Sequence, residues 1–176
     1  MLYFYDTEFD ESSGTEIKLI SIGIVREDGK EYYAECSEFD AGGCNVWVKQ
    51  FVLPKLGNNR KTRGEIRKDL DEFFRGDDSV FLVAYQGSYD HIILNRLWGP
   101  MSTRKKGFPH YTWDLKQKIE ELRHDGEVVK LPKNKKKHHA LADARWVRVA
   151  VIYLIEKHGI SMPTNKGILY YVTGTI

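Results

Sequence analysis

The stretch Leu2-Tyr3-Phe4-Tyr5-Asp6-Thr7-Glu8 opens the chain with an apolar run that ends in two acidic residues. An unbroken series of apolar and aromatic side chains predicts the first strand of a core. Residues two apart on a strand point to the same face, so the carboxylates of Asp6 and Glu8 should project together. Such a pair at a strand end needs a cation between its members or a shared proton, and its oxygen atoms suit Mg²⁺ or Mn²⁺. Taken alone, the pair is more often simply solvated where a strand emerges into a loop.

Length and composition predict the general class of protein. A chain of 176 residues suits one domain, residues 1–176, with a sizeable core. The formal net charge of +2 is too small to indicate a nucleic-acid-binding protein, so the distribution of charge must decide. The two cysteines, Cys36 and Cys44, have neither metal-ligand spacing nor a disulfide framework. The early Asp6 argues against a signal peptide, and Arg148 interrupts the most apolar late stretch, which excludes a membrane span. We therefore expect a soluble protein of a reducing, cytoplasmic compartment.

The remaining pattern predicts an α/β fold. Strands are expected at 17–25 and 31–36, joined by Asp28-Gly29, a strong hairpin signal that makes them antiparallel. The continuous apolar run 80–85 is typical of a central buried strand. The other expected elements are a short helix at 46–53 ended by Pro54, helices at 62–74, 89–98, 114–123 and 140–157, an edge strand at 111–113, and a lysine-rich loop at 126–137. This order predicts a mixed sheet flanked by helices, with a three-strand antiparallel meander plus parallel strands.

Further acidic residues should meet the first pair on this scaffold. Asp90 follows the buried strand, and open α/β sheets bind ligands beyond the carboxyl ends of their strands. Asp143 falls in the first turns of the last long helix, with His138 just before it. Asp90 alone could be an acid favoured by the helix dipole, and Asp143 alone could be solvated. The four acids and the histidine together favour a site.

Here the residues resemble a known family. The pattern Asp6-x-Glu8, Tyr89-Asp90 and His138-x-x-x-x-Asp143 is similar to the DEDDh 3′–5′ exonucleases, which have a ribonuclease-H-like fold. Longer strings, which together cover residues 2 to about 150, resemble the polyadenylate-specific exoribonuclease group, RNase AS. These strings are YFYDTEF (3–9), LISIG (19–23), EYYA (31–34), VLPKL (52–56), YDH (89–91), LWGPM (97–101) and AL-x-DAR (140–145).

The resemblance implies a two-metal mechanism. Two Mg²⁺ or Mn²⁺ ions would clamp the attacking and leaving oxygens of an in-line displacement at phosphorus. Asp6, Glu8 and Asp143 would serve mainly one ion, and Asp6 with Asp90 the other. His138 would take a proton from the attacking water. His139 competes for this role, because it lies four residues before Asp143 and would share a helix face with it. The family spacing selects His138.

The chain departs from the wider family beside the acids. Phe9 stands where many DEDDh enzymes have Thr, and Gln86 stands where they often have Asn, which bears on substrate fit rather than chemistry. Phe9 could stack on a terminal base or belong to the core. The residues expected to bind substrate are Thr7, Glu8, Phe9 and Lys137.

Basic and aromatic residues add weaker indications. Lys133, Lys135, Lys136 and Lys137 lead into His138 and are well placed to hold phosphates and guide a strand into an acidic site. The clusters Arg60-Lys61-x-Arg63 and Arg104-Lys105-Lys106 are read as solvated. Core packing is expected for Trp47, Trp98, Trp113 and Trp146. The tail after Gly159 carries no motif and is expected to cover the core or to contact a second subunit.

The sequence therefore predicts a metal-dependent 3′–5′ exoribonuclease that releases 5′-mononucleotides from single-stranded RNA, with a preference for poly(A). A 3′–5′ exodeoxyribonuclease with the same chemistry is the alternative, because the motifs do not read the sugar. An inert nucleic-acid-binding relative is disfavoured, because the four acids and the histidine are all present. The resemblance also implies a homodimer, and nothing indicates a membrane partner.

Overall fold

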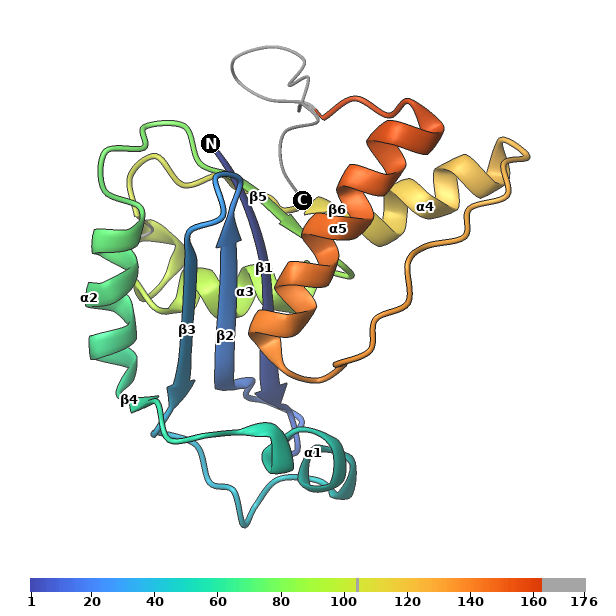
Figure 1. The fold of residues 1–176 in the computed structure, drawn as a ribbon. Helices are drawn as coiled ribbons and strands as arrows, with labels where there is room; N and C mark the ends of the chain where they lie inside the picture. Colours follow the sequence, from blue (N-terminus) through green and yellow to red (C-terminus); the bar gives the residue numbers. More distant parts are fainter. Residues whose placement is uncertain (104, 163–176) are drawn as a thin grey trace.

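A six-stranded sheet in the order β4-β3-β2-β1-β5-β6 lies at the centre of the computed structural model, which describes residues 1–103 and 105–162 (Figure 1). The strands β1, β2 and β3 are antiparallel, whereas β5 is parallel to β1, β6 to β5 and β4 to β3. The predicted meander and the predicted mixed sheet are thus confirmed. The strands are β1 Leu2–Asp10, β2 Lys18–Arg26, β3 Glu31–Cys36, β4 Arg60–Lys61, β5 Phe81–Ala84 and β6 Trp113–Asp114.

Helices cover the two faces of this sheet. They are α1 Val46–Phe51, α2 Arg63–Phe73, α3 Ser88–Arg96, α4 Leu115–His124 and α5 Ala140–His158, with short 3₁₀ turns η1 Leu53–Lys55 and η2 Met101–Thr103. The cluster on one face joins the sheet to α2 and α3, and the cluster on the other face joins it to α4 and α5. Figure 1 shows α5 lying across the sheet with its N-terminus near the end of β1 where α1 also lies.

Local sequence signals account for several element ends. Thr62 and Glu65 form the predicted capping box of α2, and the Asp114 carboxylate caps α4 as predicted. Gly29 adopts a φ of +91° in the hairpin turn between β2 and β3. The helix α5 ends at Gly159, which has left-handed backbone geometry.

Several predicted boundaries were wrong, among them the edge strand predicted at 111–113, which is β6 at Trp113–Asp114, and two others that bear on the site or its surroundings. The first strand does not end at its acids but continues to Asp10, because Asp6 and Glu8 pair with Gly23 and Ser21 of β2. The two carboxylates therefore stand on a sheet strand instead of a strand–loop junction. The helix predicted at 46–53 ends at Phe51, and Pro54 lies inside the turn η1, where its missing N–H is tolerated.

The alternation of side chains along β1 decides where the acids point. Tyr3 and Tyr5 belong to the cluster under α2 and α3, whereas Leu2 and Phe4 belong to the cluster under α4 and α5. Even-numbered residues of this strand therefore face α5. Asp6 and Glu8 continue the even-numbered series, and the fold directs them toward the N-terminal turn of that helix.

Gly23 allows α5 to approach the sheet closely. This residue pairs with Asp6 across β1 and β2, and a Cβ atom placed on it would lie 2.2 Å from the backbone nitrogen of Leu141. No side chain fits into that space, because the first turn of α5 rests directly on the β2 backbone. The missing side chain brings the start of α5 beside the acidic part of β1.

The tryptophan predictions were only partly right. Trp98 is buried, whereas Trp113 and Trp146 are half-buried. Trp47 was wrongly assigned to the core, since its side chain is 49% exposed on α1. The predictions about Arg104 and about the tail from residue 163 onward lie outside the described residues. Within the described part of the chain, no helix is long and apolar enough to cross a membrane.

Candidate active site

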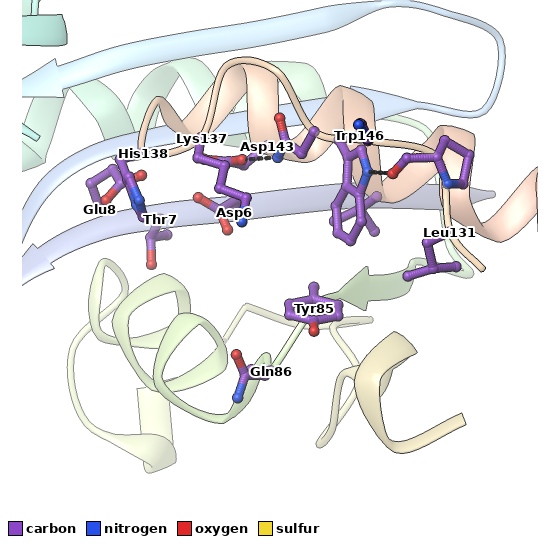
Figure 2. Close-up of a pocket in the computed structure, with 14 residues that line it drawn as sticks. Asp6, Thr7, Glu8, Tyr85, Gln86, Leu131, Lys137, His138, Asp143 and Trp146 are labelled. Carbon is purple, nitrogen blue, oxygen red and sulfur yellow. Dashed lines mark hydrogen bonds between the residues drawn. The ribbon is translucent and has the colours of Figure 1, made fainter. Parts of the chain in front are cut away.

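Three carboxylates from opposite ends of the sequence meet at one cavity. Asp6 and Glu8 come from β1 and Asp143 from the first turn of α5, and an oxygen atom of each lies within 4.8 Å of the other two (Figure 2). The structure thus brings together three of the four predicted acids. Because the set consists of carboxylate oxygens only, its chemistry fits a hard divalent cation such as Mg²⁺ or Mn²⁺.

The electrostatics of this cluster agree with that fit. Burial raises the pKa of Asp6 well above its usual range, and the charges of Asp90, Glu8 and Asp143 raise it further. Burial also raises the pKa of Glu8 to about 8, with Asp143 and Asp90 adding to the effect. Such pKa values indicate that protein groups do not compensate the negative charge here. A bound cation would supply the missing compensation.

The fourth acid, Asp90, stands apart from the group of three. It is buried in the first turn of α3, where its Oδ1 atom accepts hydrogen bonds from the backbone nitrogen of Thr7 at 2.7 Å and from Thr7 Oγ1 at 2.6 Å. Burial raises the pKa of Asp90 to about 6, against the lowering effect of the Thr7 bonds. The position of Asp90 in the first turn of α3 agrees with stabilisation of its charge by the helix dipole. Its burial shows that it is not a solvated surface residue.

Thr7 therefore positions the Asp90 carboxylate. Its side chain is buried, lines the cavity and holds Asp90 against β1. In Figure 2, Thr7 points toward α3, whereas Asp6 lies on the side of Asp143. The predicted contact of Thr7 with substrate is left as a prediction.

Asp143 is fixed by the chain segment that precedes its helix. Its Oδ1 atom accepts a hydrogen bond from Asn134 Nδ2, and its Oδ2 atom accepts one from the backbone nitrogen of His139 at 3.1 Å. Sequence reasoning missed Asn134, because one asparagine in a polar loop carries no signal of its own. The two bonds tie the lysine-rich loop to the acidic cluster.

The tandem histidines have different surroundings. His138 lines the cavity at a φ of +65°, and its ring meets the Trp47 ring edge-on with the centroids 4.8 Å apart. Its pKa is lowered by burial and by the charge of Lys55, against the opposing effect of Asp143. His139 instead begins α5, where its Nδ1 atom accepts a hydrogen bond from the Ala142 nitrogen, and it stacks on Tyr33 with centroids 4.7 Å apart. The position in the cavity thus belongs to the predicted histidine, His138.

The cavity extends well beyond the acids. It has a volume of about 620 Å³, and Pro132 is among the residues that line it. Tyr85, Gln86, Leu131 and Trp146 form its farther walls (Figure 2). The turn that carries Gln86 is held by Asp114, whose carboxylate accepts hydrogen bonds from the nitrogens of residues 86 and 87. The space is large enough for a nucleotide-sized ligand beside the carboxylates.

The predicted basic and aromatic residues are distributed unevenly around the cavity. Lys133 and Lys137 line it, whereas Lys135 and Lys136 face elsewhere. Phe9 is half-buried and stacks on the exposed ring of Tyr89, with centroids 5.3 Å apart and planes 12° from parallel.

Sequence reasoning also gave no separate role to Lys55 of η1. Its Nζ atom donates a hydrogen bond to the carbonyl oxygen of Lys137, and its charge lowers the pKa of Glu8 and of His138. The only signal for it in the sequence was its place in the string VLPKL.

The known proteins and the family that are similar to this chain in sequence are all described as 3′–5′ exoribonucleases. The family model described as the 3′–5′ exoribonuclease Rv2179c-like domain matches residues 1–155 of this chain. The 3′–5′ exoribonuclease Rv2179c of Mycobacterium tuberculosis strain H37Rv is 46% identical over 151 residues, covering 82% of this chain and 88% of that protein. The 3′–5′ exoribonuclease MT2234.1 of strain CDC 1551 matches with the same identity and coverage.

Solved structures similar in fold include several of exonuclease I. An exonuclease I structure matches with a TM-score of 0.65 at 12% identity, and it covers 88% of this chain. The zinc-bound complex of Escherichia coli exonuclease I with single-stranded DNA gives 0.65 at 12% identity over 89% of this chain, and exonuclease I of Methylocaldum szegediense gives 0.66 at 15% over 90%. The chain spans about two fifths of the length of each of these enzymes. At these identities the likeness establishes the α/β fold.

Proposed function

Because this chain belongs to the Rv2179c-like family of 3′–5′ exoribonuclease domains and is a 3′–5′ exonuclease, we propose that it is a metal-dependent exoribonuclease that shortens single-stranded RNA. It would release 5′-mononucleotides, with poly(A) as the preferred substrate. The observation that carries the proposal is the meeting of Asp6, Glu8 and Asp143 in one cavity that His138 also lines.

Four carboxylates are available to hold metal ions. Asp6, Glu8 and Asp143 would hold one divalent ion, and Asp90 with Asp6 would contribute to a second. When bound, two such ions supply a more nucleophilic water and stabilise the charge that develops on the phosphate oxygens. The protein keeps these ligands in place through the pairing of β1 with β2, the Thr7 bonds to Asp90, and the two hydrogen bonds to Asp143.

His138 is suited to accept a proton from the attacking water. Its lowered pKa favours the neutral imidazole, in which a ring nitrogen can take the proton. The neighbouring Asp143 charge then stabilises the imidazolium, because it favours the protonated form. His139 has no such opportunity, since its ring is occupied by the cap of α5 and by Tyr33.

Exposed aromatic rings near the cavity support a single-stranded substrate. Trp47 and Phe51 of α1 both lie near the His138 ring, and Tyr89 presents an exposed ring stacked on Phe9. Unpaired bases stack on such surfaces with little dependence on sequence. We place the 3′-terminal nucleotide near Glu8, and the 2′-hydroxyl is the group there that would separate RNA from DNA.

The test is digestion of matched 5′-labelled oligo(A), oligo(U), oligo(C) and oligo(dA) with Mg²⁺ or Mn²⁺, followed by separation of the products. We expect stepwise shortening from the 3′ end, fastest on oligo(A) and slowest on DNA, and no reaction in excess EDTA. Equal rates on oligo(A) and oligo(dA) would support the exodeoxyribonuclease alternative. Equal rates on the three RNA bases would remove the preference for adenylate.

The RNase AS resemblance supports two further parts of the proposal. The chain would act as a single exonuclease domain over residues 1–176, and it would form a homodimer in the cytoplasm. Sedimentation of the full chain measures the assembly, and a monomer at all accessible concentrations would contradict it.

A further inference from the structure

A second cavity lies beside the active site and is lined by basic side chains. Its volume is about 360 Å³, and its walls are Lys55, Lys135, Lys136, His139 and Ala142. We call it the basic cavity. Among the described residues, no acid lines it. The segment 133–139 separates the two spaces, because residues 133, 134, 137 and 138 line the active-site cavity whereas residues 135, 136 and 139 line the basic cavity.

Two of the three lysines of the basic cavity have no polar partner among the residues that the structure describes. Within residues 1–103 and 105–162, the ammonium groups of Lys135 and Lys136 make no hydrogen bond or ion pair, and Lys55 donates only to a backbone carbonyl. The N-terminal turn of the 19-residue helix α5 contributes His139 and Ala142 and adds a partial positive charge. Three ammonium groups and a helix N-terminus around one hollow favour an anion with several oxygen atoms, such as a phosphate.

Lys55 connects this cavity to the reacting groups. Its side chain lines the basic cavity, yet its charge acts on Glu8 and His138, and its Nζ atom contacts the carbonyl of Lys137. It follows the exposed Trp47–Phe51 pair by a few residues along α1 and η1, and both of those rings approach His138. A strand that leaves the active site over these rings would reach the lysines next.

We propose that the basic cavity binds an internucleotide phosphate of the same RNA strand whose 3′ end occupies the active site. This inference rests on the proposed function and adds to it a second contact, upstream of the bond that is cut. The contact reads the phosphate and not the base or the sugar. It holds the shortened strand near the site after each nucleotide is released.

The binding test uses a 5′-fluorescein-labelled 12-nucleotide oligo(A) and anisotropy in EDTA, so that it does not require catalysis. Lys135→Ala/Lys136→Ala should weaken binding on the order of 10-fold at 0.1 M salt and reduce the slope of log K against log[salt] by about 0.7, the contribution of one single-strand phosphate contact. The conservative double variant Lys135→Arg/Lys136→Arg should restore both values. An unchanged affinity and slope would overturn the proposal.

The matched control removes two lysines elsewhere. Lys68 on α2 and Lys157 in the last turn of α5 are exposed, and the variant Lys68→Ala/Lys157→Ala changes the net charge equally. Its affinity should fall less than twofold. An equal loss in the two double variants would show a general effect of net charge and would overturn a specific site.

A length series then links the cavity to catalysis. For the Lys135→Ala/Lys136→Ala variant, KM should rise about as much as the affinity falls on the 12-mer, and the effect should shrink toward the dinucleotide, which has no upstream phosphate. A rise in KM that is equal at all lengths would contradict the proposal. If the wild type binds RNA without cutting it, the proposed function fails while the anisotropy result still decides on the cavity. If it does neither, both proposals fail.

Discussion

The two cavities on either side of the segment 133–139 differ in how their charges are held. The acids of the active site are buried or half-buried and are fixed by β1, Thr7 and backbone hydrogen bonds, and burial raises the pKa values of Asp6, Glu8 and Asp90. The lysines of the basic cavity are exposed, and their ammonium groups make one hydrogen bond, from Lys55, within the described part of the chain. Groups that take part in bond breaking must be placed in advance, at a cost in stability, whereas groups that hold a flexible strand need only charge and reach. Substitutions on the acidic side should therefore change turnover, and those on the basic side should change affinity.

The largest effect is expected from the acids themselves. Asp6→Asn and Asp143→Asn should each reduce kcat by orders of magnitude, because metal assistance is worth several kcal/mol. In EDTA, the same variants should melt at a higher temperature than the wild type, since each removes a repelling charge from the cluster. Steady-state kinetics and thermal melts measure the two outcomes.

The exposed Glu11 offers a control, because Glu11→Gln removes a carboxylate from the same part of the chain outside the cavity. That variant should change neither property. A variant of Asp6 or Asp143 that keeps more than about a tenth of the wild-type rate with normal metal affinity would contradict the ligand assignment.

Substitutions of the two adjacent histidines should separate a loss of catalysis, at His138, from a loss of helix capping, at His139. His138→Ala should reduce the rate about 10²–10⁴-fold, the usual scale of general base catalysis, with little change in substrate affinity. His139→Ala should lower the rate much less and should cost about 1 kcal/mol of stability, because it removes the cap of α5. Rates and denaturation curves of the two variants decide, and the reverse ranking would show that the base was assigned to the wrong ring.

A substitution of Gly23 tests the close contact between β2 and the first turn of α5, which contributes residues to both cavities. Gly23→Ala forces a methyl group against the Leu141 backbone, so α5 must shift away from β2 and carry Asp143 away from Asp6. We expect a loss of about 1–3 kcal/mol in unfolding free energy, the usual cost of overpacking, and a lower kcat. Gly64→Ala on α2 is the control, because a Cβ atom there meets only Thr62 at 3.9 Å and alanine favours a helix. Equal behaviour of the two variants in melts and assays would disprove the close-approach argument.

The smallest effect is a dependence of stability on pH in the metal-free protein. The ordinary pKa of a Glu is 4.5, and that of Glu8 is about 8 in the folded state, so between these values the folded state binds more protons than the unfolded state. The unfolding free energy must therefore fall as pH rises through this window. We expect the Tm in EDTA to be a few degrees lower at pH 8 than at pH 6, and Mg²⁺ to remove most of the difference. A Tm that rises with pH would show that the cluster is already compensated.

The sequence predicted the parts of the fold that depend on local chemistry. The hairpin at Asp28-Gly29, the capping box of Thr62 and the cap at Asp114 were read from short-range rules and are confirmed. The convergence of Asp6, Glu8 and Asp143 followed from strand alternation together with a family resemblance. Their roles as ligands stay predictions.

The features that the sequence did not reveal depend on contacts between distant segments. The bonds from Thr7 to Asp90 and from Asn134 to Asp143 join elements whose relative positions no local pattern encodes. The lysine run looked uniform, but Lys133 and Lys137 line the active-site cavity whereas Lys135 and Lys136 line the basic cavity. The burial of Trp47 was overestimated, since an aromatic residue on an amphipathic helix can equally face a ligand.

The late position of Asp143 in the chain has a consequence for protein synthesis. Glu8 and Asp6 leave the ribosome early, but their partner on α5 emerges only after nearly the whole described chain has been made. A nascent chain with β1 to β5 alone holds two of the three clustered carboxylates and lacks His138. A chain segment that stops before α5 therefore holds an incomplete set of carboxylates, and we expect it to have no nuclease activity.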